Sequence, residues 1–280
     1  MTPSRFLLAG VMGWPVMHSR SPMMHNYWFD QHKLAGTYVP LAIEPAGLAA
    51  ALRALGPLGF AGCNLTIPHK QEAMKIVDEV DETARRIGAI SCVVVRPDGT
   101  LFGTNNDWFG FTHNLKQEQP AWRADAGPAV VIGAGGGSRA VCYGLMQEGA
   151  REIRLVNRTF ARAKAIADEF GGPIRALQWE ERHDALDGAA LAVNATSQGM
   201  VGQPALHLRL DRLPRGALAA DIIYIPLETP FLAAARARGH RTVNGLGMLL
   251  HQGRPAWKLW FGIEPAVTRE LRELVERSLR

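Results

Sequence analysis

Short apolar segments alternate with stretches of helical periodicity along nearly the whole chain. In the first half, this pattern predicts strands at 6–11, 38–43, 63–67, 89–95 and 101–103, and helices at 23–32, 46–55, 71–77 and 82–87. In the second half, it predicts strands at 130–132, 153–156, 174–177, 191–195, 218–224 and 241–243. Two helices close the chain, at 245–260 and 265–279, the last with Pro265 in its first turn. This alternation is typical of an α/β protein with parallel sheets.

The length of 280 residues is sufficient for two domains. A helix is predicted from 108 to about 117, capped by Asp107, and a stretch rich in Gln, Pro and Ala follows it. We therefore predict a first domain over 1–107, a linker helix and loop over 108–128, and a second domain over 129–244.

The charge and cysteine content narrow the class of protein. The net charge is +5, but the basic residues are dispersed along the chain, so no nucleic-acid surface is expected. The modest excess of positive charge would suit the binding of anionic small ligands. No apolar run is long enough to cross a bilayer or to serve as a signal peptide. Three scattered cysteines indicate reduced thiols, hence a cytoplasmic protein.

A glycine-rich turn, Gly133-Ala134-Gly135-Gly136-Gly137-Ser138, follows the strand predicted at 130–132. Glycines between a strand and a helix let backbone N–H groups approach a pyrophosphate, so the turn indicates a dinucleotide site. Ser138 occupies the third glycine position of the usual frame, and Ala140 can take over the helix-packing role. Without further context, the string is also compatible with a simple tight turn.

The residues after the next strand indicate which dinucleotide is bound. NAD sites carry an Asp or Glu there, whereas this chain reads Asn157-Arg158-Thr159 and has no acid before Asp168. Arg158 can bind a 2′-phosphate and stack on adenine, and Arg162 lies four residues on, on the same face of a helix. The sequence therefore predicts NADP.

Three polar strings in the first half suggest a substrate site. They are His18-Ser19-Arg20-Ser21-Pro22, Asn64-Leu65-Thr66-Ile67-Pro68-His69-Lys70 and Thr104-Asn105-Asn106-Asp107. If the strands that carry them are parallel, all three emerge at the carboxyl edge of one sheet, where α/β proteins bind ligands. Their hydroxyls, amides, ammonium and carboxylate suit a small polyhydroxylated acid.

With these strings, the chain resembles the shikimate dehydrogenase family from about residue 6 to 262. The resemblance rests on eight strings in the family's order and spacing: HSRSP (18–22), NLTIPHK (64–70), NNDWFGF (105–111), GAGGGSRA (133–140), NRT (157–159), NATSQGM (194–200), DIIYIP (221–226) and NGLGMLLHQG (244–253). It implies an N-terminal three-layer α/β substrate domain completed by the C-terminal helices 245–280, and a Rossmann-like NADP-binding domain.

The resemblance also implies an activity, reversible hydride transfer between NADP(H) and 3-dehydroshikimate or shikimate in aromatic amino-acid biosynthesis. Lys70 and Asp107 match the family's catalytic pair. The matching substrate contacts are Ser19, Ser21, Asn64, Thr66, Tyr224 and Gln252, and Ser91 stands at a further contact position, where the family usually has another residue. The matching cofactor positions are Gly133, Ala134, Gly135, Gly136, Gly137, Ser138, Asn157, Arg158, Thr159, Arg162, Ala195, Thr196, Ser197, Ile223, Gly245 and Met248.

The chemistry of Lys70 and Asp107 suits the same reaction. Hydride addition to a ketone leaves an alkoxide that must be protonated, and a lysine ammonium within hydrogen-bonding range is a suitable acid. Asp107 can orient Lys70 or share the proton relay, and it can also cap a helix. Met248 and Gln252 are four residues apart and therefore on one face of a helix.

The chain departs from the family pattern in the substrate region. Ser91 stands where the family usually has an Asn, and Asn106 where it usually has a Thr. A hydrogen bond lost in this way costs about 1 kcal/mol. Two alternatives therefore stay open, a paralogue that acts on quinate or another cyclic hydroxy acid, and a non-catalytic NADP(H)-binding regulatory protein. The sequence leaves open whether the protein is a monomer or a homodimer.

No metal site is expected. His18, His25 and His32 recur every seven residues, which on a helix separates neighbouring side chains by about 10 Å, too far to share one ion.

Overall fold

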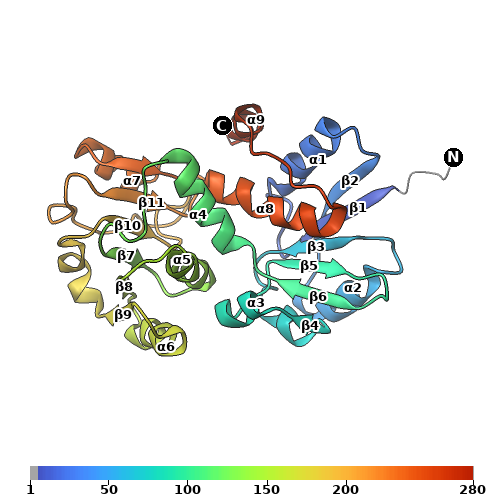
Figure 1. Cartoon of the computed structure of the whole chain (residues 1–280), viewed down its shortest axis with the longest axis horizontal. Helices are drawn as coiled ribbons and strands as arrows, with labels where there is room; N and C mark the ends of the chain where they lie inside the picture. Colours follow the sequence, from blue (N-terminus) through green and yellow to red (C-terminus); the bar gives the residue numbers. More distant parts are fainter. Residues whose placement is uncertain (1–5, 280) are drawn as a thin grey trace. The chain divides into compact units, whose positions relative to one another are not determined.

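The computed structural model describes residues 6–279, and the chain divides into two compact units (Figure 1). Unit 1 contains the described residues up to Asn106, together with Gln252–Ser278. Unit 2 contains Asp107–His251. Each unit is built around its own six-stranded sheet with helices against it, so the expectation of an α/β fold is confirmed.

The sheet of unit 1 is mixed. Its strands are β1 (Leu7–Gly13), β2 (Gly36–Ala42), β3 (Gly62–Leu65), β4 (Glu79–Val80), β5 (Cys92–Val95) and β6 (Leu101–Thr104). They lie in the order β2-β1-β3-β5-β6-β4. The expectation of parallel strands is wrong for β5, which runs antiparallel to both β3 and β6. Because β5 is reversed, β6 runs in the same direction as β1 and β3.

Helices cover both faces of this sheet. They are α1 (Ser21–Gln31), α2 (Leu48–Ala54), α3 (Glu82–Ile87), the part of α8 (Leu246–Phe261) from Gln252 onward, and α9 (Arg269–Arg277); short 3-10 turns lie at Pro45–Gly47 and Glu72–Lys75. On the face covered by α2, Leu48 and Leu52 pack with Cys63 and Leu65 of β3 in one apolar cluster. Unit 1 is therefore a three-layer α/β/α structure.

The opposite face of the sheet is covered by aromatic side chains from α1 and α8. The ring of Phe29 lies 4.8 Å from that of Trp257, and the indole N–H of Trp260 donates to the carbonyl of Val93 on β5 at 2.9 Å. Gly62 admits Trp260, because a Cβ at position 62 would lie 2.3 Å from its Nε1. The aromatic layer therefore fixes α1 and the second part of α8 to the sheet.

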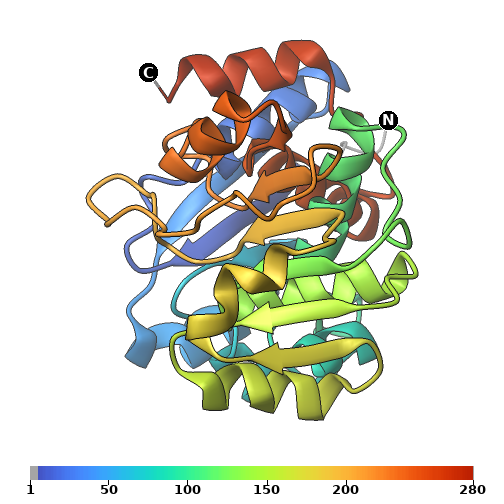
Figure 2. The same cartoon turned by 90° about the vertical axis from the view of Figure 1, so that its left-hand side faces the viewer.

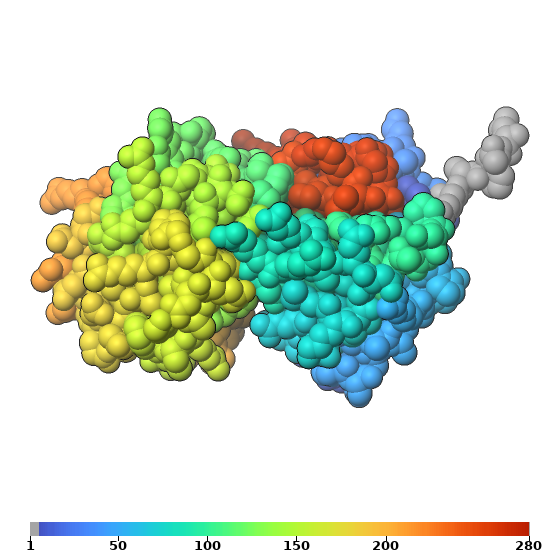
Figure 3. All heavy atoms as spheres, turned by 60° about the horizontal axis from the view of Figure 1, so that its bottom comes forward, coloured from blue at the N-terminus to red at the C-terminus, as the bar shows by residue number. Residues whose placement is uncertain are grey.

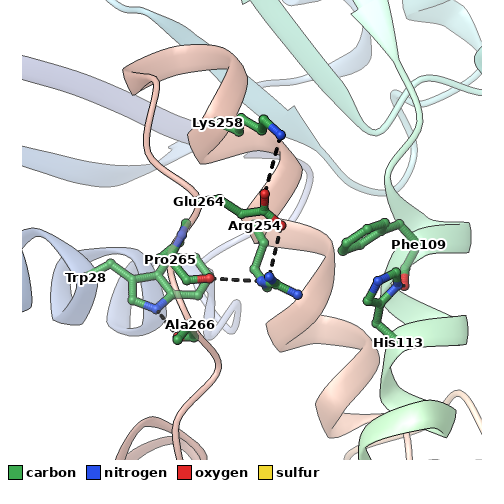
Figure 4. Close-up of polar contacts among 8 residues, drawn as sticks. All are labelled: Trp28, Phe109, His113, Arg254, Lys258, Glu264, Pro265 and Ala266. Carbon is green, nitrogen blue, oxygen red and sulfur yellow. Dashed lines mark hydrogen bonds and ion pairs between the residues drawn. The ribbon is translucent and has the colours of Figure 1, made fainter.

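The segment after α8 is tied back to α1 and α8 (Figure 4). The indole N–H of Trp28 donates to the carbonyl of Ala266 at 3.0 Å, and Nε of Arg254 donates to the carbonyl of Pro265 at 2.9 Å. Arg254 and Lys258 both pair with the Glu264 carboxylate. These contacts keep the chain extended between α8 and α9.

The sheet of unit 2 is entirely parallel. Its strands are β7 (Ala129–Ile132), β8 (Ile153–Val156), β9 (Ile174–Leu177), β10 (Leu191–Asn194), β11 (Leu218–Asp221) and β12 (Arg241–Val243). In Figure 2 they lie side by side, with the yellow β9 at one end and the orange β11 and β12 at the other. The order β9-β8-β7-β10-β11-β12 is that of the Rossmann fold, in which dinucleotides bind where the strand order reverses. Here the reversal lies between β7 and β10.

Helices flank this sheet as well. They are α4 (Asp107–Glu118), α5 (Gly136–Gln147), α6 (Phe160–Phe170), α7 (Pro230–Ala237) and the first part of α8; 3-10 turns lie at Trp179–Arg182 and Asp184–Leu186. In the view of Figure 3, the yellow-green and yellow segment from α6 to these turns forms much of the surface of unit 2. The helix expected from 108 to about 117 is α4, which begins one residue earlier, at Asp107, and belongs to unit 2. It packs closely on α5, where a Cβ at Gly144 would lie 3.2 Å from the Trp108 carbonyl oxygen.

Two predicted helices differ from the structure. The last one begins at Arg269 and not near Pro265, because the Thr268 side chain accepts the N–H of Leu271 and caps the helix there. The stretch predicted as a helix at 71–77 holds only the 3-10 turn Glu72–Lys75. Among residues 6–279, we find no helix with the length and apolar character needed to cross a bilayer.

Candidate active site

The polar strings of unit 1 meet at one edge of its sheet. Strands β1, β3 and β6 end at this edge, and the chain continues from them into the loop with Ser19, the segment to Lys70, and Asn105-Asn106. Because β5 is antiparallel, it begins where the others end, and Ser91 precedes it directly. The structure thus brings Ser19, Ser21, Asn64, Thr66, Lys70 and Ser91 to the same edge.

Asn64 is held on both sides of its amide. Its Oδ1 accepts the hydroxyl of Tyr38 at 2.8 Å, and its Nδ2 donates to the Ser91 carbonyl at 3.1 Å. The hydroxyl oxygen of Ser91 accepts the backbone N–H of Asn106 at 2.8 Å, so this buried serine also fixes the end of β6. Ser91 therefore contacts Asn64 through its backbone and Asn106 through its side chain.

The segment that carries Lys70 is anchored by its neighbours. The backbone N–H of Thr66 donates to Met12 of β1, and the buried His69 donates through Nε2 to the carbonyl of Ile43 at 2.8 Å. The carbonyl of Lys70 accepts the N–H of Ile90 at 2.8 Å. His69 belongs to the polar string that the sequence offers for the site, but the sequence assigns it no role, and its anchoring bond to Ile43 is visible only in the structure.

The serine loop is held by Arg20. The Oγ of Ser19 accepts the N–H of Ser21 at 3.2 Å, and the Arg20 guanidinium donates to the carbonyls of His18 and, at 2.9 Å, Ser278. Arg20 therefore ties the loop to the end of α9.

In unit 2, the glycine turn leads from β7 into α5. Gly133 has φ +115°, and a Cβ there would lie 2.9 Å from the carbonyl oxygen of Ala195, so this position requires glycine. The N–H of Gly135 donates to Oγ of Ser138, a buried residue whose hydroxyl reaches the Ala195 carbonyl at 3.4 Å. The positive end of the α5 dipole faces the turn, as an anion site requires.

A hollow of about 230 Å³ lies at the turn. Its lining includes Arg158 and Arg162, and among the described residues neither arginine has an ion-pair partner. Helix α6 starts directly after Thr159, as predicted, so both arginines lie at its beginning. The full lining is Gly133, Ala134, Gly135, Asn157, Arg158, Arg162, Trp179, Ala195, Thr196, Ser197 and Gln198. No carboxylate belongs to this set, so a phosphate meets only positive charge and neutral groups.

Trp179 and Gln198 were not predicted for this lining. The predicted cofactor residues outside it are Gly136, Gly137, Ser138, Thr159, Ile223, Gly245 and Met248.

The remaining predicted site residues are divided between the two units. Tyr224 and Met248 belong to unit 2. Met248 lies in α8, four residues before Gln252, which belongs to unit 1. Gly245 lies against Ile222, since a Cβ there would be 2.1 Å from the Ile222 carbonyl oxygen. Asp107 is the buried first residue of α4 in unit 2, whereas Lys70 belongs to unit 1.

Asn194 and Asp221, to which the sequence alone assigns no role, organise the loop after β10. Asn194 Oδ1 accepts the backbone N–H and the hydroxyl of Thr196, and its Nδ2 donates to the carboxylate of Asp221 at 3.0 Å. The Asp221 carboxylate also accepts from Thr229 Oγ1 at 2.7 Å and from the N–H of Ile223 at 3.0 Å. These buried bonds join the ends of β10 and β11 and hold the loop that lines the hollow.

Burial raises the pKa of Asp221 to about 6, although its three donors favour the charged form. The loop that lines the hollow is therefore held by a carboxyl group that loses its proton near pH 6.

Three family models that match successive parts of the chain all describe shikimate dehydrogenases. Residues 11–93 match the shikimate dehydrogenase substrate binding domain, residues 116–207 match shikimate / quinate 5-dehydrogenase, and residues 245–275 match the shikimate 5'-dehydrogenase C-terminal domain. The chain belongs to the shikimate dehydrogenase family. A family relative, the shikimate dehydrogenase (NADP(+)) of Rhodospirillum rubrum, is 52% identical over 279 residues, which cover 98% of this chain and 99% of the relative.

Solved structures of the family have the same fold. The shikimate 5-dehydrogenase of Thermus thermophilus, in complex with NADP(H) and shikimate, has a TM-score of 0.87 at 37% identity and covers 98% of this chain and 100% of its own. The quinate dehydrogenase of Corynebacterium glutamicum, in complex with NAD, has a TM-score of 0.89 at 32% identity and covers 96% and 98%. The fold alone therefore does not separate shikimate from quinate enzymes within this family.

Residues 6–279 contain no group of three or more His, Cys, Asp or Glu side chains arranged to hold a metal ion.

We expect Asp221 to make stability depend on pH. Its folded pKa is about 6 against 3.8 when unfolded, so the folded state binds more protons between these values and stability falls as pH rises from about 4 to 6. The loss should amount to about 2–3 kcal/mol. Urea denaturation of the native protein and of Asp221→Asn across this range measures it. A difference in unfolding free energy between the native protein and the variant that does not change with pH would contradict the prediction.

Proposed function

We propose that this protein is an NADP-dependent shikimate dehydrogenase, which reversibly transfers a hydride between NADP(H) and 3-dehydroshikimate or shikimate. The observation that carries the proposal is the near-complete similarity, at 52% identity, to a relative named shikimate dehydrogenase (NADP(+)). The arginine-lined hollow without a carboxylate supports NADP as the cofactor.

The glycine turn and the start of α5 bind the pyrophosphate through backbone N–H groups, and Arg158 with Arg162 binds the 2′-phosphate. When bound, NADP(H) supplies or accepts the hydride. The residues Asn157, Thr159, Ala195, Thr196 and Ser197 shape the remainder of this binding surface. Ile223, Gly245 and Met248 would contact the nicotinamide.

Lys70 and Asp107 carry the acid–base chemistry. In the direction of reduction, the substrate carbonyl becomes an alkoxide and takes up a proton from Lys70, which Asp107 orients or reprotonates. In the direction of oxidation, the same pair removes the hydroxyl proton as the hydride leaves. The hydroxyls and amides of Ser19, Ser21, Asn64, Thr66, Tyr224 and Gln252 hold the polyhydroxylated ring and its carboxylate.

Ser91 contributes to substrate binding through its two neighbours. Its carbonyl holds the Asn64 amide, and its hydroxyl holds the backbone of Asn106, next to Asp107.

We further propose that the enzyme works in the cytoplasm, as a monomer or homodimer and without a nucleic-acid partner. In support, all three cysteines are free and buried, which suits a reducing compartment.

Steady-state assays with shikimate and with quinate, each with NADP and with NAD, test the proposal. We expect kcat/KM to be highest for shikimate with NADP. A preference for quinate would replace the substrate assignment, and a preference for NAD would remove the cofactor assignment. No reduction of either cofactor with either acid would refute the enzyme function itself.

We expect Lys70→Ala to lower kcat by about 10²–10⁴-fold, because the alkoxide loses its proton donor. The NADP dissociation constant, measured by fluorescence titration, should stay nearly unchanged. Lys75→Ala is a matched control, since Lys75 is an exposed lysine of the same segment and pairs with Glu72. A kcat close to that of the native enzyme would exclude Lys70 from the acid–base role.

We expect Arg158→Ala to raise the KM for NADP by about 10–100-fold and to change the KM for NAD far less, because only NADP carries the 2′-phosphate. Arg151→Ala, which removes an exposed arginine outside the hollow, is the control. Equal weakening of both cofactors would contradict the assignment of Arg158 to the 2′-phosphate.

A further inference from the structure

We propose that Tyr38 is a positioning residue for substrate binding, which fixes the amide of Asn64 so that an N–H points to the substrate. The inference rests on the proposed role of Asn64 as a substrate contact. Tyr38 lies in β2, and its hydroxyl donates to Asn64 Oδ1 at 2.8 Å. No sequence pattern pointed to this residue.

The register of the sheet explains how Tyr38 reaches Asn64. On β1, Ala9 pairs with Tyr38 on one side and with Gly62 on the other, so all three lie on the same face of the sheet. Asn64 is two residues beyond Gly62 and therefore shares this face. The small side chain of Ala9 lets the Tyr38 ring extend across β1 toward the ligand edge.

The two partners of Asn64 leave one orientation for its amide. Oδ1 faces the Tyr38 hydroxyl and Nδ2 faces the Ser91 carbonyl. A flipped amide would bring Oδ1 against the Ser91 oxygen, and two acceptors repel each other. Since Nδ2 carries two hydrogens and Ser91 takes one, the second remains for a substrate hydroxyl or carboxylate. Asn64 is half-buried, which gives a ligand access to it.

Tyr38 is itself held rigidly. Its buried ring stacks on the imidazole of His25, with 3.9 Å between the ring centroids and 3° between the planes. The indole N–H of Trp257 donates to His25 Nδ1 at 2.6 Å. Burial lowers the pKa of His25 to about 3, so the imidazole stays neutral, and burial raises the pKa of Tyr38, so its hydroxyl keeps its proton. The contacts thus run from Trp257 of α8 through His25 of α1 and Tyr38 of β2 to the side-chain amide of Asn64.

Tyr38→Phe tests the proposal, because it retains the ring and its stack on His25 and removes only the donor. We expect the KM for shikimate to rise about 3–10-fold, with a smaller change in kcat and no change in the KM for NADP. Tyr27→Phe is the matched control, since the Tyr27 hydroxyl forms its hydrogen bond with Thr268 of the same unit, away from Asn64. An unchanged KM for shikimate in Tyr38→Phe would overturn the proposal.

A double-mutant cycle separates positioning from general loss of structure. If Tyr38 acts through Asn64, adding Tyr38→Phe to Asn64→Ala should leave the KM for shikimate where Asn64→Ala alone puts it. A further rise equal to that in the native background would show that Tyr38 acts elsewhere. Both tyrosine variants should lose a similar amount of thermal stability, measured as the unfolding midpoint. If only Tyr38→Phe also changes the KM for shikimate, the positioning role is supported.

An NMR measurement tests the pairing without shikimate turnover and without altering Tyr38. The buried, hydrogen-bonded hydroxyl proton of Tyr38 should exchange slowly and give its own resonance, and Asn64→Ala should shift or remove it. An unaffected resonance would contradict the bond. This readout stays valid if the native enzyme fails to oxidise shikimate, so failure of the proposed function and failure of this inference can be told apart.

Discussion

In unit 1, the antiparallel pairing of β5 between β3 and β6 determines where the polar groups of the substrate side can lie. The register sets Asn64 beside Cys92 and Cys92 beside Thr104, so the residue before β5 sits between the ends of the two neighbouring strands. Ser91 occupies that place and bonds to both sides. With β5 parallel, Ser91 would lie at the opposite edge, and Asn64 and Asn106 would have neither partner.

Unit 2 meets a different requirement, because its sheet is entirely parallel and its ligand edge consists of loops. Loops have few backbone partners of their own, so buried side chains have to hold them. Asn194 and Asp221 do this for the loop after β10, through bonds that join two strand ends. The glycine turn is held by the start of α5, which begins within it, and by the buried Ser138, whose hydroxyl oxygen accepts the Gly135 N–H.

The sequence predicts much of this arrangement. Periodicity identifies most strands, and the glycine spacing identifies the turn between β7 and α5, where Arg158 lines the hollow. The sequence does not predict the reversal of β5, because four apolar residues in a row do not indicate whether the strand runs parallel or antiparallel to its neighbours. It also misses Tyr38 and Asp221, whose roles depend on partners 26 and 27 residues away in the chain. Such pairings follow from sheet register, which is a property of the folded chain.

The way Ser91 holds Asn64 has a consequence for how this site can change. The contact runs through the main-chain carbonyl of residue 91, which every amino acid possesses. The side chain at 91 can therefore be exchanged without disturbing the orientation of the neighbouring amide. A substitution at 91 would remove the side-chain bond to Asn106, whereas the carbonyl that holds Asn64 would remain, so the two neighbours of Ser91 can change independently.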